Sequence, residues 1–146
     1  MNEEKPIGAE IRHTDNLIKA YIDQTLENHL KENLTGIEGM TMGYIFRHQD
    51  QEITAKEVMA RSRVSKATTS QTLNGLVKKG YIRMSPSKTD KRKKVITLTA
   101  KGEQVEAEFN EIFKEISARV KKGITPEEEA TVRGILAKIR ANVGGE

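Results

Sequence analysis

Apolar residues recur at near-helical intervals, with charged residues between them, from about residue 7 to residue 34. This spacing predicts a long N-terminal helix. A shorter segment at residues 40–46 is apolar on most sides, which predicts a second helix that is buried. Apolar stripes over residues 105–120 and 132–143 predict two helices near the other end of the chain.

The middle of the chain has the start and stop signals of two short helices. Thr54 and Glu57 have the spacing of a capping box, and the helix that they open should break at Arg61-Ser62-Arg63. Ser65 is a good N-cap for a second helix over Lys66–Lys79, and the following Gly80 is a stop signal. The buried stripe of this second helix is expected to be Leu73, Leu76 and Val77.

Beyond that helix, apolar residues no longer recur at helical spacing. Tyr81–Met84 and Val95–Leu98 are short and rich in residues that favour strands. The connection between them holds Pro86, Asp90 and five basic residues, which predicts a β-hairpin with a long charged tip. The basic residues are Lys88, Lys91, Arg92, Lys93 and Lys94.

Two short helices followed by a basic hairpin are the pattern of a winged helix-turn-helix. The expected fold is mostly α with a small β-hairpin wing: a winged helix-turn-helix lobe plus a helical dimerisation region. Residues 1–35 should form the N-terminal helix of the dimerisation region, residues 36–100 the DNA-binding lobe, and residues 101–146 the C-terminal dimerisation helices. These amphipathic outer helices should pack on a second copy about a twofold axis. The alternative is that they cover the core of a single chain.

Charge is distributed unevenly along the 146 residues. Between Lys56 and Lys101 there are thirteen Lys and Arg against two acids, a net charge of +11, while the remainder carries −7, for a total of +4. A basic middle between acidic ends indicates a surface that faces a polyanion. A solvated basic face without a partner is the alternative.

Several other functions are disfavoured by composition. The chain has no cysteine, which excludes disulfides, cysteine zinc sites and thiol-based redox sensing. The N-terminus lacks the apolar run of a signal peptide, and no stretch approaches the ~20 apolar residues of a membrane span, so we expect a cytoplasmic protein without membrane contact. His13, His29 and His48 lack metal-ligand spacing, and we expect no metal or cofactor. The alternative is a zinc site in a folded dimer, formed by His13 with Glu10 or by His29 with a nearby acid. No phosphate-binding loop, nucleophile elbow or paired carboxylate motif supports an enzyme.

The predicted second helix of the middle segment has the size and side chains for reading DNA. It is roughly 20 Å long at ~1.5 Å per residue, and the major groove admits such a helix. Gln and Asn can pair with adenine, Thr can donate or accept, and small apolar groups can contact a thymine methyl. The helix N-terminus should face a phosphate, Arg92 should enter the minor groove, and the wing lysines should contact phosphates. The candidate DNA-binding residues are Ser65, Lys66, Ala67, Thr68, Gln71, Thr72, Asn74, Lys88, Lys91, Arg92 and Lys93.

Two segments of the chain form a further pattern. The first runs from Val64-Ser65-Lys66-Ala67-Thr68 to Tyr81-Ile82, and the second from Asp90-Lys91-Arg92 to Leu98-Thr99 and Gly102. Together they resemble the MarR family of bacterial transcriptional regulators. The resemblance implies a homodimer that binds an inverted repeat in a promoter, with Arg92 as the wing arginine. It also implies a small-molecule effector whose pocket lies near the first two helices and the DNA-binding lobe. The glycine- and methionine-rich residues 36–43 depart from the family pattern.

The sequence therefore predicts a sequence-specific DNA-binding regulator. The resemblance implies that it responds to a ligand and acts as a repressor, the more common outcome in the family, with activation as the alternative. Its partners would be double-stranded DNA, a second copy of the chain and a small-molecule effector. Two alternatives remain at this point. One is a winged-helix module used for protein interaction, and the other is a nonspecific DNA-binding protein, whose affinity would depend steeply on salt but little on sequence.

Overall fold

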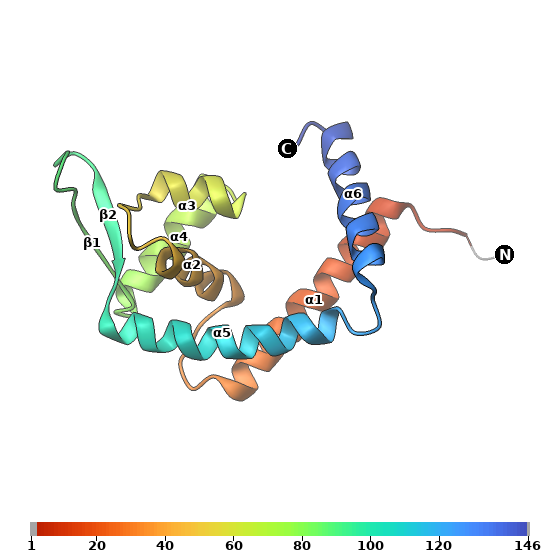
Figure 1. Cartoon of the computed structure of the whole chain (residues 1–146), viewed down its shortest axis with the longest axis horizontal. Coiled ribbons are helices and arrows are strands. Elements are labelled where there is room, and N and C mark those ends of the chain that lie inside the picture. Colours follow the sequence, from red (N-terminus) through yellow and green to blue (C-terminus); the bar gives the residue numbers. More distant parts are fainter. Residues whose placement is uncertain (1–2, 146) are drawn as a thin grey trace. The chain divides into compact units, whose positions relative to one another are not determined.

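The computed structural model describes residues 3–145 and confirms a mostly helical chain with one β-hairpin (Figure 1). The chain divides into two compact units, the first ending at Ile116 and the second beginning at Ser117. The helices and strands of the described residues are α1 (Ile7–His29), α2 (Gly36–Arg47), α3 (Ala55–Ser62), α4 (Lys66–Lys78), β1 (Ile82–Pro86), β2 (Lys94–Leu98), α5 (Ala100–Val120) and α6 (Pro126–Asn142).

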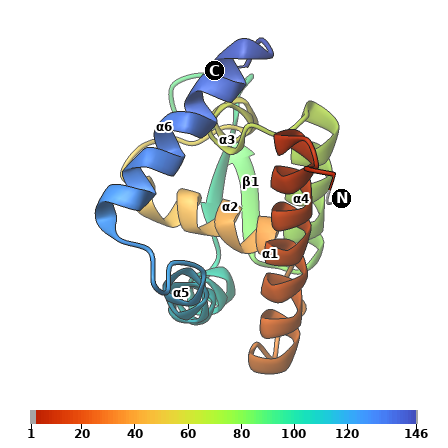
Figure 2. The same cartoon turned by 90° about the vertical axis from the view of Figure 1, so that its right-hand side faces the viewer.

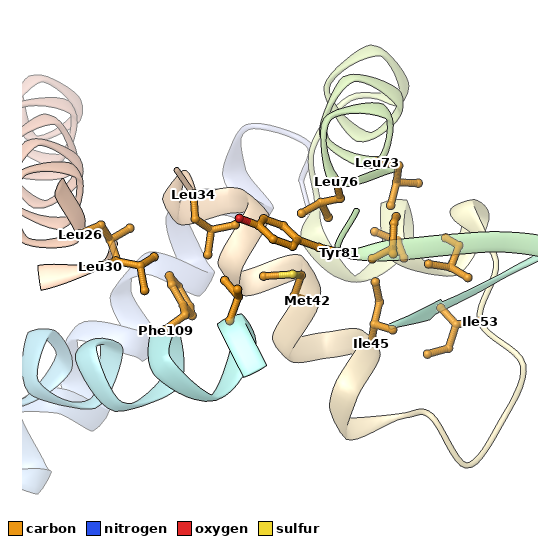
Figure 3. Packing of buried hydrophobic residues seen from close by; sticks show 14 residues of the cluster. Leu26, Leu30, Leu34, Met42, Ile45, Ile53, Leu73, Leu76, Tyr81 and Phe109 are labelled. Atoms are coloured by element: carbon orange, nitrogen blue, oxygen red, sulfur yellow. The ribbon is translucent and has the colours of Figure 1, made fainter. Parts of the chain in front are cut away.

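The first unit has one apolar core, to which α1 to α5 and the hairpin all contribute. Met42 and Ile45 of α2 and Leu76 of α4 are completely enclosed. Figure 3 shows the ring of Tyr81 lying among Leu34, Met42 and Leu76. Because these side chains come from segments far apart in sequence, their burial holds the helices and the hairpin together as one body.

The first helix ends earlier than its apolar spacing predicts. We expected helix to about residue 34, but α1 ends at His29 and the next residue, Leu30, is extended. Leu30 and Leu34 continue the apolar spacing of α1 in the sequence, but the backbone there is not helical. Both residues are apolar because their side chains are buried in the core. A new helix starts directly afterwards, since Thr35 and Glu38 form a complete capping box at the start of α2.

The glycine- and methionine-rich residues 36–43 are the first two turns of α2. A Cβ atom on Gly39 would overlap the ring of Phe109 from α5, so only glycine allows the two helices to approach this closely. Figure 2 shows α5 nearly end-on beneath α2. The unusual composition of this segment therefore has a packing reason.

The hairpin is antiparallel, with Ile82 opposite Leu98 and Pro86 opposite Lys94. Its second strand also bonds to the connection between α2 and α3, because the Ile96 N–H donates to the Ile53 carbonyl at 2.8 Å. The hairpin is thereby joined to the segment that leads into α3 by a backbone hydrogen bond as well as by apolar packing.

The second unit contains the end of α5 and all of α6. Thr125 and Glu128 form a capping box at the start of α6, and Pro126 occupies its first turn. Within this unit α6 buries no side chain completely, and Val132 and Ile135 are 52% and 44% exposed. An amphipathic helix with an uncovered apolar side is typical of an element that has a further packing partner.

Candidate nucleic-acid interface

Two helices separated by a tight turn form the centre of the candidate interface. At the start of α3, the Thr54 N–H donates to the Glu57 carboxylate at 3.0 Å, as the sequence predicts. The turn then passes through Arg63, which has a left-handed backbone with φ 56° and ψ 28°. Ser65 caps α4 by accepting a hydrogen bond from the Thr68 N–H at 3.1 Å. The cap and the left-handed turn together set where α4 begins.

One side of α4 is free for contact with a partner molecule. Ala67, Gln71, Asn74 and Lys78 are all exposed, and their spacing of three or four residues places them on one face of the helix. Thr68 is half-buried, and its hydroxyl accepts a hydrogen bond from Ser65 at 2.9 Å. This face presents amides, a methyl group and a cation, which suit the donors, acceptors and methyl groups of base edges.

Two residues of α4 differ from their sequence-based predictions. Thr72 is only 8% exposed, and its hydroxyl donates to the Thr68 carbonyl at 2.8 Å, so its side chain does not lie on the exposed face. Val77, expected in the buried stripe, is 42% exposed. The buried side is centred on Leu73 and Leu76, with Thr72 inside it, and Val77 lies about a quarter turn away from that centre.

The wing loop, residues 87–93, presents exposed cations. The Arg92 side chain is 93% exposed, and its Nε donates to Asp90 Oδ1 at 3.2 Å. The Arg92 backbone N–H donates to the same oxygen at 3.1 Å, so the carboxylate holds both the backbone and the guanidinium. The loop and the start of β2 carry four exposed lysines, Lys88, Lys91, Lys93 and Lys94.

Two carboxylates, one beside the wing loop and one within it, remain ionised at neutral pH. Hydrogen bonds from the Ser87 hydroxyl and then the Lys88 backbone N–H lower the pKa of Glu52. Hydrogen bonds from the Arg92 side chain and backbone lower the pKa of Asp90. Sequence reasoning missed Glu52, because 35 residues separate it from Ser87 and no local pattern connects the two.

The end of α4 is attached to the start of α2 through a buried carboxylate. Glu38 Oε1 accepts hydrogen bonds from the Thr35 N–H at 2.9 Å and from Lys79 Nζ at 2.7 Å. Nearby, the Tyr81 hydroxyl donates to Glu32 at 3.0 Å, and burial together with this acid raises the pKa of Tyr81 to about 12. These contacts fix the orientation of α4 relative to α2, and with it the direction of the exposed face.

An open groove with a volume of about 760 Å³ lies along α1 and the connection to α2. Ile22, Leu26 and Met40 contribute apolar surface to it, while Lys19 and Glu32 contribute charge. In residues 3–145, no helix is long and apolar enough to span a membrane. No three His, Asp or Glu side chains of the same residues are grouped for metal binding.

A helix-turn-helix with an exposed polar face, followed by a basic hairpin, defines a winged helix-turn-helix protein. Comparison with known proteins agrees with this class. Residues 32–93 match the family model described as "MarR family". A comparison with functionally curated sequences finds no match.

Solved structures give matches over nearly the whole chain. MepR from S. aureus in complex with DNA is 26% identical, with 95% of this chain and 99% of that chain covered and a TM-score of 0.85. PefR from Streptococcus agalactiae in complex with heme is 28% identical, with 96% and 95% covered and a TM-score of 0.69. A variant of E. coli MarR bound to operator DNA shares the fold, with 21% identity, 92% and 93% covered and a TM-score of 0.78. Residues 32–93 thus resemble the MarR family, and nearly the whole chain shares the winged helix-turn-helix fold of these solved structures.

Proposed function

We propose that this protein is a transcriptional regulator of the MarR family, a homodimeric repressor that binds an inverted-repeat operator and releases it when a small molecule binds. The observation that carries the proposal is the exposed face of α4, where the side chains of Gln71 and Asn74 make no hydrogen bond with any described residue. Amide side chains on an uncovered helix face, within a segment of net charge +11 from Lys56 to Lys101, suit sequence-specific DNA better than a protein surface.

Each part of the lobe, which we assign to residues 36–100, has a distinct role in this proposal. Ala67, Thr68, Gln71 and Asn74 contact base edges in the major groove. The capped N-terminus of α4, with Ser65 and Lys66, binds a phosphate. Thr72 is left out because it is buried. In the wing, Arg92 enters the minor groove, and the phosphate contacts come from Lys88, Lys91 and Lys93.

The outer helices form the dimer interface in this proposal, with residues 1–35 and 101–146 as the dimerisation region. Uncovered apolar side chains on both parts support it: Leu17 of α1 is exposed, as are Val132 and Ile135 of α6. Dimerisation would remove this surface from water, and a twofold axis would place two winged lobes on two half-sites.

The groove along α1 is the proposed effector site. Its volume of about 760 Å³ is that of a small-molecule site, and six apolar and five charged side chains line it. The heme complex of PefR supports effector binding in a related chain. An effector lowers operator affinity only if it binds the DNA-free arrangement more tightly than the DNA-bound arrangement.

Selection from a pool of random duplexes, at a fixed salt concentration near physiological, tests DNA recognition. We expect the wild type to enrich a palindrome, and Arg92→Ala to bind that palindrome about tenfold more weakly, which corresponds to ~1.4 kcal/mol. Arg12→Ala removes the same charge from α1 and should retain wild-type affinity. Binding without enrichment would instead indicate a nonspecific DNA-binding protein, and no DNA binding would indicate a protein-interaction module.

Sedimentation tests the dimer. The wild type should sediment at twice the 16.4 kDa mass of the chain. Ile135→Glu places a charge on the apolar side of α6, so it should yield monomers that bind the palindrome weakly. Lys138→Glu changes the charge at an exposed polar position of the same helix and should remain dimeric. A wild-type monomer at micromolar concentration would contradict the proposed dimer.

A further inference from the structure

Glu52 connects the segment before α3 to the wing. Its Oε2 accepts a hydrogen bond from the Ser87 hydroxyl at 2.7 Å, and its Oε1 accepts one from the Lys88 N–H at 3.2 Å. The adjacent Ile53 carbonyl accepts the bond from Ile96 of β2. Two consecutive residues therefore bind both the wing loop and the strand that follows it, and they join the wing to the helix-turn-helix.

Ser87, the first residue of the wing loop, makes several of the hydrogen bonds that hold the loop together. Only 3% of Ser87 is exposed, and its hydroxyl oxygen accepts hydrogen bonds from the backbone N–H groups of Thr89 at 3.1 Å and Asp90 at 3.2 Å. Its own backbone N–H donates to the Lys93 carbonyl at 2.9 Å and closes the loop. The carboxylate of Asp90 in turn holds Arg92. A continuous series of hydrogen bonds thus runs from Glu52 through Ser87 and Asp90 to the exposed guanidinium.

An acid is unexpected at this place if only charge is considered. Glu52 lies against a loop that carries exposed lysines, and a carboxylate beside the phosphates of bound DNA would repel them. Simple electrostatics therefore predicts that its removal strengthens DNA binding. The hydrogen bonds predict the opposite, because the wing would lose the contacts that hold its tip in one conformation.

We propose that Glu52 is a positioning residue, which acts through Ser87 and Asp90 to hold Arg92 in the conformation that contacts DNA. This inference rests on the proposed function, in which the wing contacts the operator. Without Glu52 a smaller fraction of molecules has the wing in the DNA-competent conformation, and the apparent affinity falls in proportion to that fraction.

The test measures operator affinity by fluorescence anisotropy at one salt concentration. Glu52→Gln keeps the size of the side chain but replaces one acceptor oxygen with a donor, so the side chain can no longer accept from both the Ser87 hydroxyl and the Lys88 N–H. We expect about tenfold weaker binding. Asp50→Asn is the matched control: Asp50 is exposed two residues away, and its side chain bonds to no described residue. It removes the same charge and should leave affinity unchanged or slightly higher.

A double-mutant cycle with Arg92→Ala separates positioning from a general structural effect. If Glu52 acts through Arg92, Glu52→Gln should weaken binding by less than about twofold in the Arg92→Ala background. Ser87→Ala should reproduce the loss seen with Glu52→Gln, and circular dichroism should show both variants folded. If Glu52→Gln weakens binding equally in the wild-type and Arg92→Ala backgrounds, or tightens it, the role assigned to Glu52 is overturned. Either result would leave the proposed wing contact intact. An Arg92→Ala variant with wild-type affinity would overturn the wing contact itself, and the inference with it.

Discussion

Replacing Gly102 with alanine tests the close contact between α5 and the start of the hairpin. A Cβ atom at this position would overlap the carbonyl oxygen of Tyr81 and lie 2.9 Å from its carbonyl carbon. The same carbonyl accepts the Thr99 N–H at 3.0 Å, and the Thr99 hydroxyl caps α5 by accepting the Gly102 N–H at 3.0 Å. Because the obstacle is backbone, a change of side-chain rotamer cannot relieve the overlap, and α5 must move away from the hairpin.

Three contributions set the expected loss of stability. Overpacking of a close contact costs about 1–3 kcal/mol, and the upper part of that range applies because backbone must shift. Weakening the Thr99 hydrogen bond costs about another 1 kcal/mol. Alanine gains up to about 1 kcal/mol in helix propensity over glycine. The free energy of unfolding should therefore fall by about 2–3 kcal/mol, and the melting temperature by roughly 6–10 °C.

Urea unfolding followed by circular dichroism measures this loss, with all variants at one protein concentration because a dimer's stability depends on it. Gly39→Ala is the matched comparison. Its Cβ would overlap the ring of Phe109, a side chain that can move, so the loss should be smaller. Phe109→Leu should partly rescue Gly39→Ala but not Gly102→Ala. A Gly102→Ala variant within about 0.5 kcal/mol of wild type would refute the reasoning from backbone overlap.

Three further outcomes are expected from single substitutions, each measured by urea unfolding. Ser65→Ala removes the N-cap of α4 and should lower the free energy of unfolding by about 1 kcal/mol, whereas an unchanged value would mean that the cap contributes nothing. Arg63→Gly should raise it by roughly 0.5–1 kcal/mol, because glycine adopts the left-handed backbone without strain; a loss would contradict this account. Burial raises the pKa of Glu106 above its ordinary value, although Arg47 opposes the shift. The folded state then binds the proton more tightly than the unfolded state, so stability falls as pH rises from the ordinary pKa of a glutamate through the raised one. Glu106→Gln lacks this dependence and should be more stable than wild type at about pH 7, with a difference that shrinks toward about pH 4; an equal difference at both pH values would argue against it.

Local patterns in the sequence determined the identity and order of the elements. The capping box at Thr54, the N-cap at Ser65 and the stop at Gly80 each depend on residues close together in the chain, so their geometry can be read from spacing. The exposed face with Gln71 and Asn74 also follows from helical periodicity. Periodicity predicted the end of α1 wrongly. Leu34 is buried and keeps the apolar spacing of α1, yet the helix ends at His29.

Only the tertiary structure decided which residues position that interface. The hydrogen bonds that Tyr81 donates to Glu32, Lys79 to Glu38 and Ser87 to Glu52 join residues 49, 41 and 35 positions apart. Spacing along the chain carries no signal at such separations, because the partners meet only after the helices and hairpin pack around a common core. The sequence therefore determined which side chains are available to contact DNA, and packing decided how they are held.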